Sequence, residues 1–293
     1  MEIEQNVSLA DFSTLKVGGP ADFFVRAENL DGLKKALEFA GFKNLPVLVL
    51  GGGSNILFPD AGFRGLVLKN EITGIEFEEN LVKVGAGEAL ASLISQSAEK
   101  NLAGLENLAG VPGTVGGAVV GNSNEIGARI ISVTIFENGA AKVLEKSELE
   151  FSYRDSNLRD KILIEIEFEL QESSENLKEK IADLIRQKTE KQPYIGTAGS
   201  WFRNPSSSEF LRASPDGRSA WELIDQAGCR GLQIGGARVS EKHTNFFENT
   251  GSATAADFLE LEKTVSEKVK EKFEIELERE VIVVRGIGWR KMM

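Results

Sequence analysis

Two glycine-rich segments contain residue types that could bind a phosphate or a flat ligand. The first, GGGSN at residues 51–55, directly follows the apolar run at 47–50, which is typical of a buried strand. Glycine lets the backbone approach a ligand closely, and consecutive free N–H groups bind anions. Ser54 and Asn55 add side-chain donors. The segment is neither a Walker A loop nor a Gly-x-Gly-x-x-Gly fingerprint, and a simple tight turn also explains it.

The second segment, AGVPGTVGGAVVGN at 109–122, has five glycines among small apolar residues. Such a stretch packs its own side chains poorly, so it suits contact with a flat ligand or with another backbone. A loop that makes a close helix–strand contact is an equally good interpretation. A third segment, STLKVGGPADFF at 13–24, contains Gly-Gly-Pro and indicates a turn between two strands.

Helices and strands that could position these segments follow from apolar periodicity. We predict helices at 28–41, 88–101, 172–191, 221–227 and 254–273, and strands at 47–50, 66–69, 74–78, 81–84, 131–136, 141–144, 162–170 and 280–284. The first helix should bury Leu30, Leu33, Leu37 and Ala40 and end at Gly41. The last begins with Thr254 and Asp257 at capping-box spacing, before a core stripe of Phe258, Leu261, Val265 and Val269. We expect the tail at 286–293 to be loose.

Composition excludes several classes of protein. The net charge of −11 disfavours a nucleic-acid partner, although Arg203, Arg212, Arg218, Arg230, Arg238 and Lys242 could make one cleft locally positive. A lone Cys229 and a lone His243 argue against a disulfide and against a metal site. No apolar run approaches the ~20 residues of a membrane span, and the acidic N-terminus has no signal-peptide core. We therefore expect a cytoplasmic protein without a membrane partner.

The ordered motifs resemble one family, the UDP-N-acetylenolpyruvoylglucosamine reductases. The resemblance runs through TLKVGGPADFF (14–24), VLGGGSNIL (49–57), VGAGEAL (84–90), GLENLAGVPGTVGGAVVGN (104–122), FSYRDS (151–156), KQP (191–193), AGSWFRNP (198–205), LIDQAGCRGLQIGGARVSEKHTNFF (223–247) and LEREV (277–281). Each motif alone is moderately specific, but their succession covers nearly the whole chain. The short stretch between Arg154 and Ser200 resembles the branch that lacks a tyrosine-bearing loop, which is the type II-like branch.

The resemblance implies an α+β chain: a two-domain FAD-binding fold (a PCMH/VAO-like flavin fold) plus a C-terminal α+β substrate-binding domain. We divide the chain into a first FAD-binding subdomain at 1–70, to which the strand at 279–293 returns, a second at 71–190, and a substrate-binding domain at 191–278. FAD and NADPH are the implied cofactors, and the implied partner is a small molecule, UDP-N-acetylglucosamine enolpyruvate. We expect a monomer.

By the same resemblance, three residues are catalytic. Ser200 corresponds to the proton donor, Arg154 to the arginine that binds the developing enolate, and Glu280 to the catalytic glutamate. Burial would raise the pKa of Glu280 and keep it protonated. Without the motifs, Ser200 would be interpreted as a turn or cap residue, Arg154 as the surface partner of Asp155, and Glu280 as one more solvated charge.

The resemblance also implies two sets of binding residues. The flavin would contact Leu50, Gly51, Gly52, Gly53, Ser54, Asn55, Ile56, Val111, Pro112, Gly113, Thr114, Gly116, Gly117 and Ala118. Its diphosphate would sit on N–H groups of residues 51–55 and 111–117. The substrate and nicotinamide cleft would include Tyr153, Arg203, Asn204, Lys242, His243 and Asn245. A purely structural role for His243 is equally plausible.

The chain departs from the family pattern at two places. Residues 121–128 read GNSNEIGA where small apolar residues usually follow the glycine segment, although Asn122 could still contact the flavin. Trp201 stands where phenylalanine is commoner, beside Ser200. Two other functions are weighed against the reductase: an oxygen-using flavin oxidase and a flavin-binding protein without activity. Many such oxidases attach the flavin through a histidine near the glycine segment, and this chain has no histidine there. A protein that only binds flavin would not need Ser200, Arg154 and Glu280.

Overall fold

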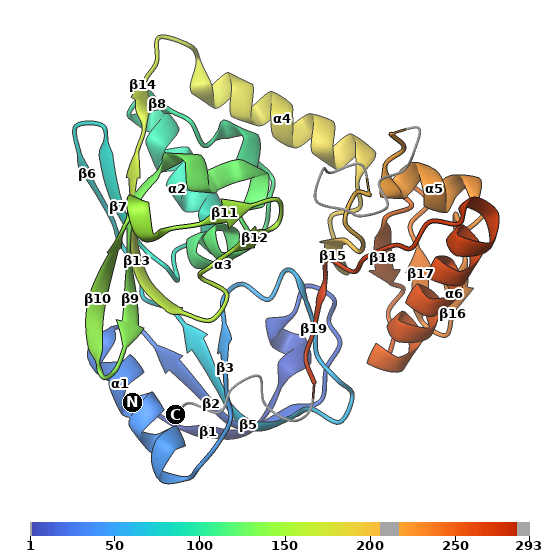
Figure 1. Ribbon diagram of the computed structural model, residues 1–293, viewed down its shortest axis with the longest axis horizontal. Helices are drawn as coiled ribbons and strands as arrows, with labels where there is room; N and C mark the ends of the chain where they lie inside the picture. The colour runs from blue at the N-terminus through green and yellow to red at the C-terminus, as the bar shows by residue number, and fades with distance from the viewer. Residues whose placement is uncertain (1, 206–216, 286–293) are drawn as a thin grey trace.

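The computed structural model describes residues 2–205 and 217–285, so the predicted tail at 286–293 and Arg212 lie outside the described residues. The described chain forms three principal sheets, which follow one another in sequence (Figure 1). Helices and strands are both well represented, which confirms the α+β class. Each sheet lies within one of the three segments into which we divided the chain, and this arrangement supports that division as a proposal.

The first sheet has the strand order β1 (Glu4–Ser8), β2 (Pro20–Ala27), β5 (Phe63–Asn70) and β3 (Val47–Leu50). The β1–β2 pair is antiparallel, whereas β5 runs parallel to both β2 and β3. Helix α1 (Leu30–Phe42) packs against β2 and β5. The prediction found β3, part of β5 and this helix. The connection between two strands predicted at Gly-Gly-Pro is confirmed by β1 and β2, whose bounds were not predicted.

Helix α1 differs from its predicted form at both ends. Leu30 is 40% exposed, since the buried face consists of Leu33, Ala36, Leu37 and Ala40. The helix also continues past Gly41, and Asn44 takes the left-handed conformation that ends it (φ 52°). Asparagine tolerates that conformation because its short polar side chain bonds locally.

The second sheet is antiparallel throughout and has the order β10 (Ala140–Glu145), β9 (Ile130–Glu137), β13 (Ile162–Glu169), β7 (Leu81–Gly85) and β6 (Ile75–Glu78). The predicted hairpin and the alternating strand after it are confirmed. Helices α2 (Leu90–Glu99) and α3 (Val115–Val120) share one hydrophobic core with this sheet. No helix was predicted within residues 109–122, so α3 is an addition: Thr114 caps a helical turn there.

Helix α4 (Leu177–Lys191) begins later than predicted and leads along the surface to the third sheet (Figure 1). That sheet has the order β15 (Thr197–Ser200), β18 (Phe246–Asn249), β17 (Ala237–Val239) and β16 (Gln233–Ile234). Helices α5 (Ala220–Gln226) and α6 (Ala255–Phe273) complete this part. The capping box and buried stripe predicted for α6 are confirmed. The four short strands were not predicted.

The end of the described chain returns to the first sheet region. Strand β19 (Ile282–Val283) pairs in parallel with β4 (Ile56–Leu57), directly after the first glycine segment. It is shorter than the predicted strand at 280–284. Smaller elements complete the fold: β8 (Leu102–Ala103) with β14 (Gln171–Glu172), β11 (Phe151–Ser152) with β12 (Asp155–Ser156), and 3-10 turns at Leu9–Phe12, Glu106–Leu108, Ser123–Arg129 and Lys146–Glu148.

Across residues 2–205 and 217–285, no helix is both long and apolar enough to cross a lipid bilayer. The same residues contain no cluster of three or more histidine, cysteine, aspartate or glutamate side chains suited to a metal ion.

Candidate active site

The two predicted glycine segments meet in the structure. The Ser54 hydroxyl donates to the Pro112 carbonyl at 3.0 Å. A Cβ added to Gly52 would lie 2.6 Å from the Gly113 Cα, and one added to Gly51 would lie 2.6 Å from the Thr114 Oγ1. Real Cβ atoms do not approach so closely, so the two backbones touch only because these positions lack side chains. The close contact accounts for the glycines and brings two sets of backbone N–H groups to one place.

Those N–H groups form the part of the site suited to an anion. Among the described residues, none accepts a hydrogen bond from the backbone N–H groups of residues 51–55, 113 or 114. Six of these seven residues are buried or half-buried, and only Gly52 is exposed. Backbone donors in such positions are nearly always paired, so the open ones on these facing loops indicate a missing acceptor. A row of such donors is the arrangement that binds a diphosphate. The residues present therefore fit the predicted FAD.

The second segment contributes fewer donors than its sequence suggested. The N–H groups of Val115 and Gly116 already bond to the carbonyls of Glu88 and Ala86, and that of Gly117 bonds to the Thr114 hydroxyl. These bonds hold the first turn of α3 against β7 and α2. Of the N–H groups at 111–117 that were expected to bind the diphosphate, only those of Gly113 and Thr114 remain open.

Lys69 supports the first glycine segment from beneath. Its Nζ donates to the Gly51 carbonyl at 2.6 Å. No carboxylate of the described chain lies within ion-pair distance of it, because the nearby Glu71 pairs with Arg26 at 3.0 Å. Burial lowers the pKa of Lys69, with the charge of Glu71 opposing that effect. Since a trans peptide is planar, a Gly51 carbonyl turned toward Lys69 directs the Gly52 N–H the opposite way.

A second cluster is built on Arg154 and Glu280. The Arg154 Nε lies 3.1 Å from a Glu280 carboxylate oxygen, and only 15% of the Glu280 side chain is exposed. The geometry is that of an ion pair without an aligned hydrogen bond, so the buried Arg154 Nε–H has no acceptor among the described residues. The Arg203 Nε–H is also buried and has no acceptor among the described residues. Arg154 also has a left-handed backbone (φ 57°), which is uncommon for a residue with a side chain and is frequent at functional sites.

Burial raises the pKa of Glu280, while the charges of Arg154, Arg203 and Arg159 act in the opposite direction. The net effect favours the protonated carboxyl relative to an ordinary glutamate, as the sequence analysis anticipated. A neutral carboxyl can donate a hydrogen bond, which a carboxylate cannot do. The cluster therefore combines a fixed cation with an acid that keeps its proton to a higher pH than an ordinary glutamate does.

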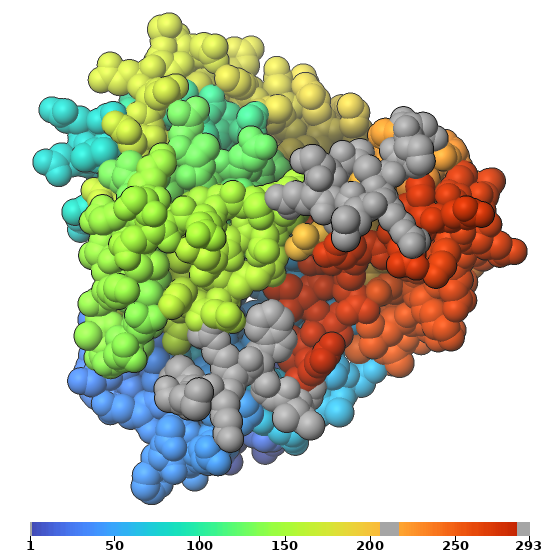
Figure 2. All heavy atoms as spheres, in the orientation of Figure 1, coloured from blue at the N-terminus to red at the C-terminus, as the bar shows by residue number. Residues whose placement is uncertain are grey.

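Backbone pairing brings Ser200 beside this cluster. Ser200 ends β15, and the following residues pair with the segment that carries Glu280: the Glu280 N–H donates to the Trp201 carbonyl at 2.8 Å, and the Arg203 N–H donates to the Glu278 carbonyl at 2.8 Å. Trp201 is fully buried, whereas Ser200 is partly exposed. Figure 2 shows a narrow hollow where the green middle of the chain faces the red C-terminal segment.

The six predicted substrate residues fall into two groups. Tyr153 and Arg203 lie at the cluster: the Tyr153 hydroxyl accepts from the Asn204 N–H at 3.4 Å, and Arg203 lies 3.5 Å from Glu278. The Asn204 side chain instead accepts from the Ala220 N–H, at the start of α5. Both ends of the Asn245 amide bond to the backbone of Phe202, so this side chain braces the strand after Ser200.

Lys242 and His243 make their contacts with other parts of the chain. The Lys242 Nζ donates to the Thr189 carbonyl at the end of α4. The His243 ring packs edge-on against Phe246, and burial lowers its pKa, so it is neutral near pH 7. Of the described basic residues in this part, Arg230 and Arg238 pair with Asp225 and Glu248, so these two do not contribute free charge to a positive cleft.

The structure rules out one alternative for Arg154 and shows a bracing role for Asn122. Asp155 pairs with Arg159, while Arg154 pairs with Glu280 instead of with Asp155. The Asn122 side chain bonds to the Ser152 carbonyl and the Gly127 N–H, so it links the end of α3 to the Arg154 turn. Asn122 thereby braces the loop, and its amide is already occupied.

Arg159 and Lys188 are site residues that the sequence analysis missed. Arg159 donates to the Arg154 carbonyl at 2.6 Å, and Lys188 donates to the Ala109 carbonyl at 2.6 Å, next to the second glycine segment. The i,i+4 spacing of Asp155 and Arg159 was a visible signal for the first. Lys188 occurs in a helix with many charged residues, where nothing in the sequence distinguishes it.

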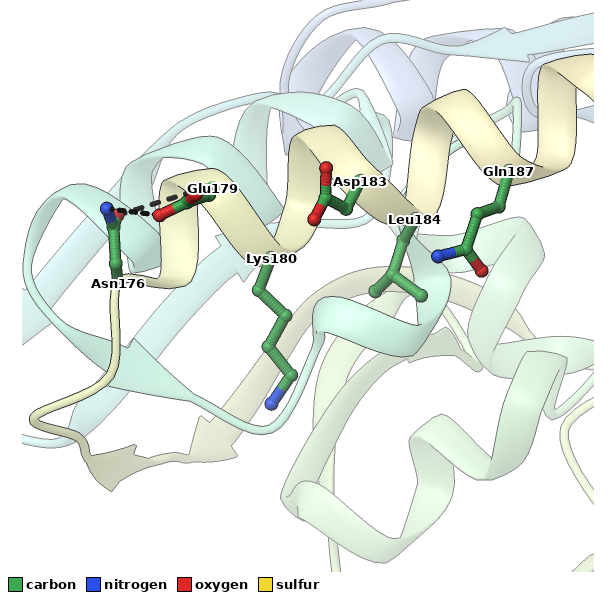
Figure 3. A pocket seen from close by; sticks show the side chains of 6 residues that line it. All are labelled: Asn176, Glu179, Lys180, Asp183, Leu184 and Gln187. Atoms are coloured by element: carbon green, nitrogen blue, oxygen red, sulfur yellow. Dashed lines mark hydrogen bonds between the residues drawn. The ribbon is translucent and has the colours of Figure 1, made fainter.

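A separate groove runs along α4 and is lined by Asn176, Glu179, Lys180, Asp183, Leu184 and Gln187 (Figure 3). Its polar groups bond to each other and to nearby carboxylates: Asn176 contacts Glu179, and Lys180 pairs with Glu106 and Glu175. It lies outside the two clusters and contains no group set up for chemistry.

Family models and curated relatives match most of the chain. An FAD binding domain model matches residues 21–134, and a model of the UDP-N-acetylenolpyruvoylglucosamine reductase C-terminal domain matches 187–284. The UDP-N-acetylenolpyruvoylglucosamine reductase of Chlamydia muridarum is 39% identical over 96% of this chain and 94% of its own. That of Trichlorobacter lovleyi is 38% identical over 93% of this chain and 90% of its own.

A solved structure extends the likeness to the fold. The UDP-N-acetylenolpyruvylglucosamine reductase of Thermus caldophilus has a TM-score of 0.82 and 35% identity, covering 97% of this chain and 100% of that one. The predicted combination of an FAD-binding part and a C-terminal domain is confirmed. The chain belongs to the UDP-N-acetylenolpyruvoylglucosamine reductase family and is an FAD-dependent oxidoreductase.

Proposed function

We propose that this chain reduces UDP-N-acetylglucosamine enolpyruvate to UDP-N-acetylmuramate with NADPH, a step in the synthesis of peptidoglycan precursors. The observation that carries the proposal is the pairing of the buried Glu280 carboxyl with Arg154 at 3.1 Å, beside the strand that ends at Ser200. The names of the relatives specify the substrate. We further propose a cytoplasmic monomer, in keeping with a buried and unpaired Cys229.

The glycine segments would hold the FAD. The open N–H groups of residues 51–55, 113 and 114 would bind the diphosphate, and Leu50, Ile56 and the first turn of α3 would pack around it. When bound, FAD accepts a hydride from NADPH and donates it to the methylene carbon of the enolpyruvyl ether. The protein supplies position and electrostatics for the remainder of the reaction.

Arg154 and Arg203 would bind the charge that develops on the substrate. Hydride addition leaves an electron pair on the adjacent carbon, which is delocalised into the substrate carboxylate as an enolate. The Nε–H groups of both arginines are buried and without acceptors in the described structure, so a carboxylate would satisfy them. A planar, permanently charged guanidinium suits that role. Arg159 would hold the Arg154 turn through the Arg154 carbonyl.

Glu280 would donate a hydrogen bond to the enolate from its protonated form. Burial raises its pKa, so the proton is retained at a higher pH than in an exposed glutamate. Ser200 would then transfer its hydroxyl proton to the carbon that carries the electron pair, completing the saturated lactyl ether. A serine is a weak acid, but an enolate is basic enough to accept its proton, which Ser200 regains from solvent.

NADPH oxidation by purified, FAD-loaded protein, measured with and without UDP-N-acetylglucosamine enolpyruvate, tests the proposal. We expect oxidation that requires the substrate and falls by ~10²–10⁴-fold in Ser200→Ala, the usual contribution of a positioned acid. Oxidation that is equally fast without substrate but needs oxygen would instead identify an oxidase. A yellow protein that oxidises no NADPH under either condition would leave only flavin binding.

A further inference from the structure

A single carboxylate connects the two strands that carry the predicted acids. The Trp201 indole N–H donates to a Glu262 oxygen at 3.0 Å, and the Arg279 Nε donates to the same oxygen at 2.7 Å. Trp201 is the residue after Ser200, and Arg279 is the residue before Glu280. We call Trp201, Glu262 and Arg279 the Glu262 clamp.

The clamp is built into the core of the third sheet region. The Trp201 ring is fully buried and stacks on Phe247 at 4.6 Å and on Phe258 at 5.3 Å. Phe258 and Glu262 lie one turn apart on α6, so the same helix face supplies both a stacking ring and the carboxylate. Only 13% of the Glu262 side chain is exposed, and charge-assisted hydrogen bonds to a largely buried carboxylate are strong and directional.

Backbone hydrogen bonds between the same two segments fix the position of Ser200 relative to Glu280. The Trp201 carbonyl accepts from the Glu280 N–H at 2.8 Å, and Phe202 forms a bridge with Arg279. The side-chain bonds through Glu262 and the backbone bonds therefore connect the same two segments, the one after Ser200 and the one that contains Glu280. A shift of either strand would stretch both links, so the clamp restrains Ser200 relative to Glu280.

We propose that Glu262 is a positioning residue for the substrate-reduction step: acting through Trp201 and Arg279, it holds Ser200 and Glu280 in register across the substrate. This inference rests on the proposed function. It also gives the indole of Trp201 a specific task, since a phenylalanine at this position could stack between the same rings but could not bond to Glu262. Within the described structure, none of the three clamp residues bonds to the glycine segments. Asn55 does bond to the Glu280 carbonyl at 3.4 Å, so the test measures FAD content as well as both reaction steps.

Rapid-mixing measurements on FAD-loaded Trp201→Phe and Glu262→Gln test the inference by separating two steps. One is flavin reduction by NADPH without oxygen, and the other is reoxidation of the reduced flavin by UDP-N-acetylglucosamine enolpyruvate. We expect unchanged reduction and reoxidation slowed by ~10–100-fold, the range produced by a misplacement near 1 Å. The solvent deuterium isotope effect on reoxidation should rise, because proton transfer becomes slower. The double variant should be no slower than Glu262→Gln, since both changes break one link.

Glu137→Gln is the matched control, because it removes an ion pair of the same 2.7 Å length, to Lys161, in the second sheet. It should leave both steps unchanged. Unchanged reoxidation in both clamp variants, with or without a lower melting temperature, would overturn the inference and leave the proposed function standing. Failure of the wild-type reduced flavin to react with the enolpyruvyl nucleotide would overturn the proposed function, and the inference with it.

Discussion

The molecule has two regions suited to negative charge, and they are built in opposite ways. The glycine segments present backbone N–H groups, held by close contact between two loops that tolerate no side chains. The Arg154–Glu280 cluster presents side chains, held by ion pairs and by strands that meet through backbone bonds. The first region is suited to a ligand that stays bound. The second combines a fixed cation with a group that can carry a proton, and it is suited to charge that appears only during a reaction.

This contrast predicts that the first region loses its ligand when a substitution displaces its backbone. Gly53 has φ 66°, and an added Cβ would lie 1.8 Å from the Phe12 carbonyl oxygen. Gly53→Ala should therefore displace the loop and cost several kcal/mol of stability, with FAD binding lost. Thermal unfolding and the FAD content of the purified variant would show this.

Gly41→Ala is the control for that change, because the helical position of Gly41 is open and an alanine there meets nothing within 4 Å. It should stabilise α1 by about 0.5–1 kcal/mol. An FAD-loaded Gly53→Ala variant with normal stability would contradict the account of the loop.

A smaller effect should follow from Lys69, whose side chain supports the first glycine segment. Lys69→Met removes the hydrogen bond to the Gly51 carbonyl and the positive charge beneath the loop. Hydrogen bonds of charged groups contribute about 1.5–3 kcal/mol, so the dissociation constant for FAD should rise at least about tenfold. Titration of the apoprotein with FAD measures it. Lys83→Met, at a half-exposed lysine 4.0 Å from Glu167, should have no effect, and equal affinities in both variants would exclude the proposed support.

The smallest predicted effect is a pH dependence confined to the second region. The pKa of Glu280 is raised in the folded state, so its contribution to stability is complete below the unfolded pKa and is lost as the pH rises through the folded pKa. The loss is at most about 1.4 kcal/mol per pH unit, the limit for one proton. Urea unfolding across that window should show it for the wild type. Glu280→Gln, which cannot ionise, should be flatter, and a wild type that gains stability over that window would reverse the sign.

The sequence predicted the glycine segments better than the Arg154–Glu280 cluster, for physical reasons. Glycine runs and the capping box of α6 are local signals: the two glycine segments lie in contact, and α6 begins at its predicted cap. The four short strands of the third sheet have too few residues to show a period. Helix α3 is short and lies among glycines, so it shows no helical pattern in the sequence. Local periodicity could not pair Arg154 with Glu280, so the chemical roles came from the resemblance to a family.

Supporting residues were the least predictable part of the site. Lys69 sits in a strand where a lysine would ordinarily face solvent, and its contact with Gly51 depends on how β5 and β3 pair. Glu262 is one of several acids on α6, and only packing against Trp201 distinguishes it from the others. Asp155 was the nearest acid to Arg154 in sequence, yet the acid that pairs with it comes from the last described segment.

The central claim is that the glycine segments serve the flavin and that Ser200, Arg154 and Glu280 serve only the substrate. Mixing pre-reduced Ser200→Ala enzyme with UDP-N-acetylglucosamine enolpyruvate without oxygen, and following flavin absorbance, tests it most directly. We predict normal FAD content, flavin reduction by NADPH at the wild-type rate, and reoxidation slowed by ~10²–10⁴-fold. Reoxidation at the wild-type rate, or equal slowing of both steps, would contradict the claim.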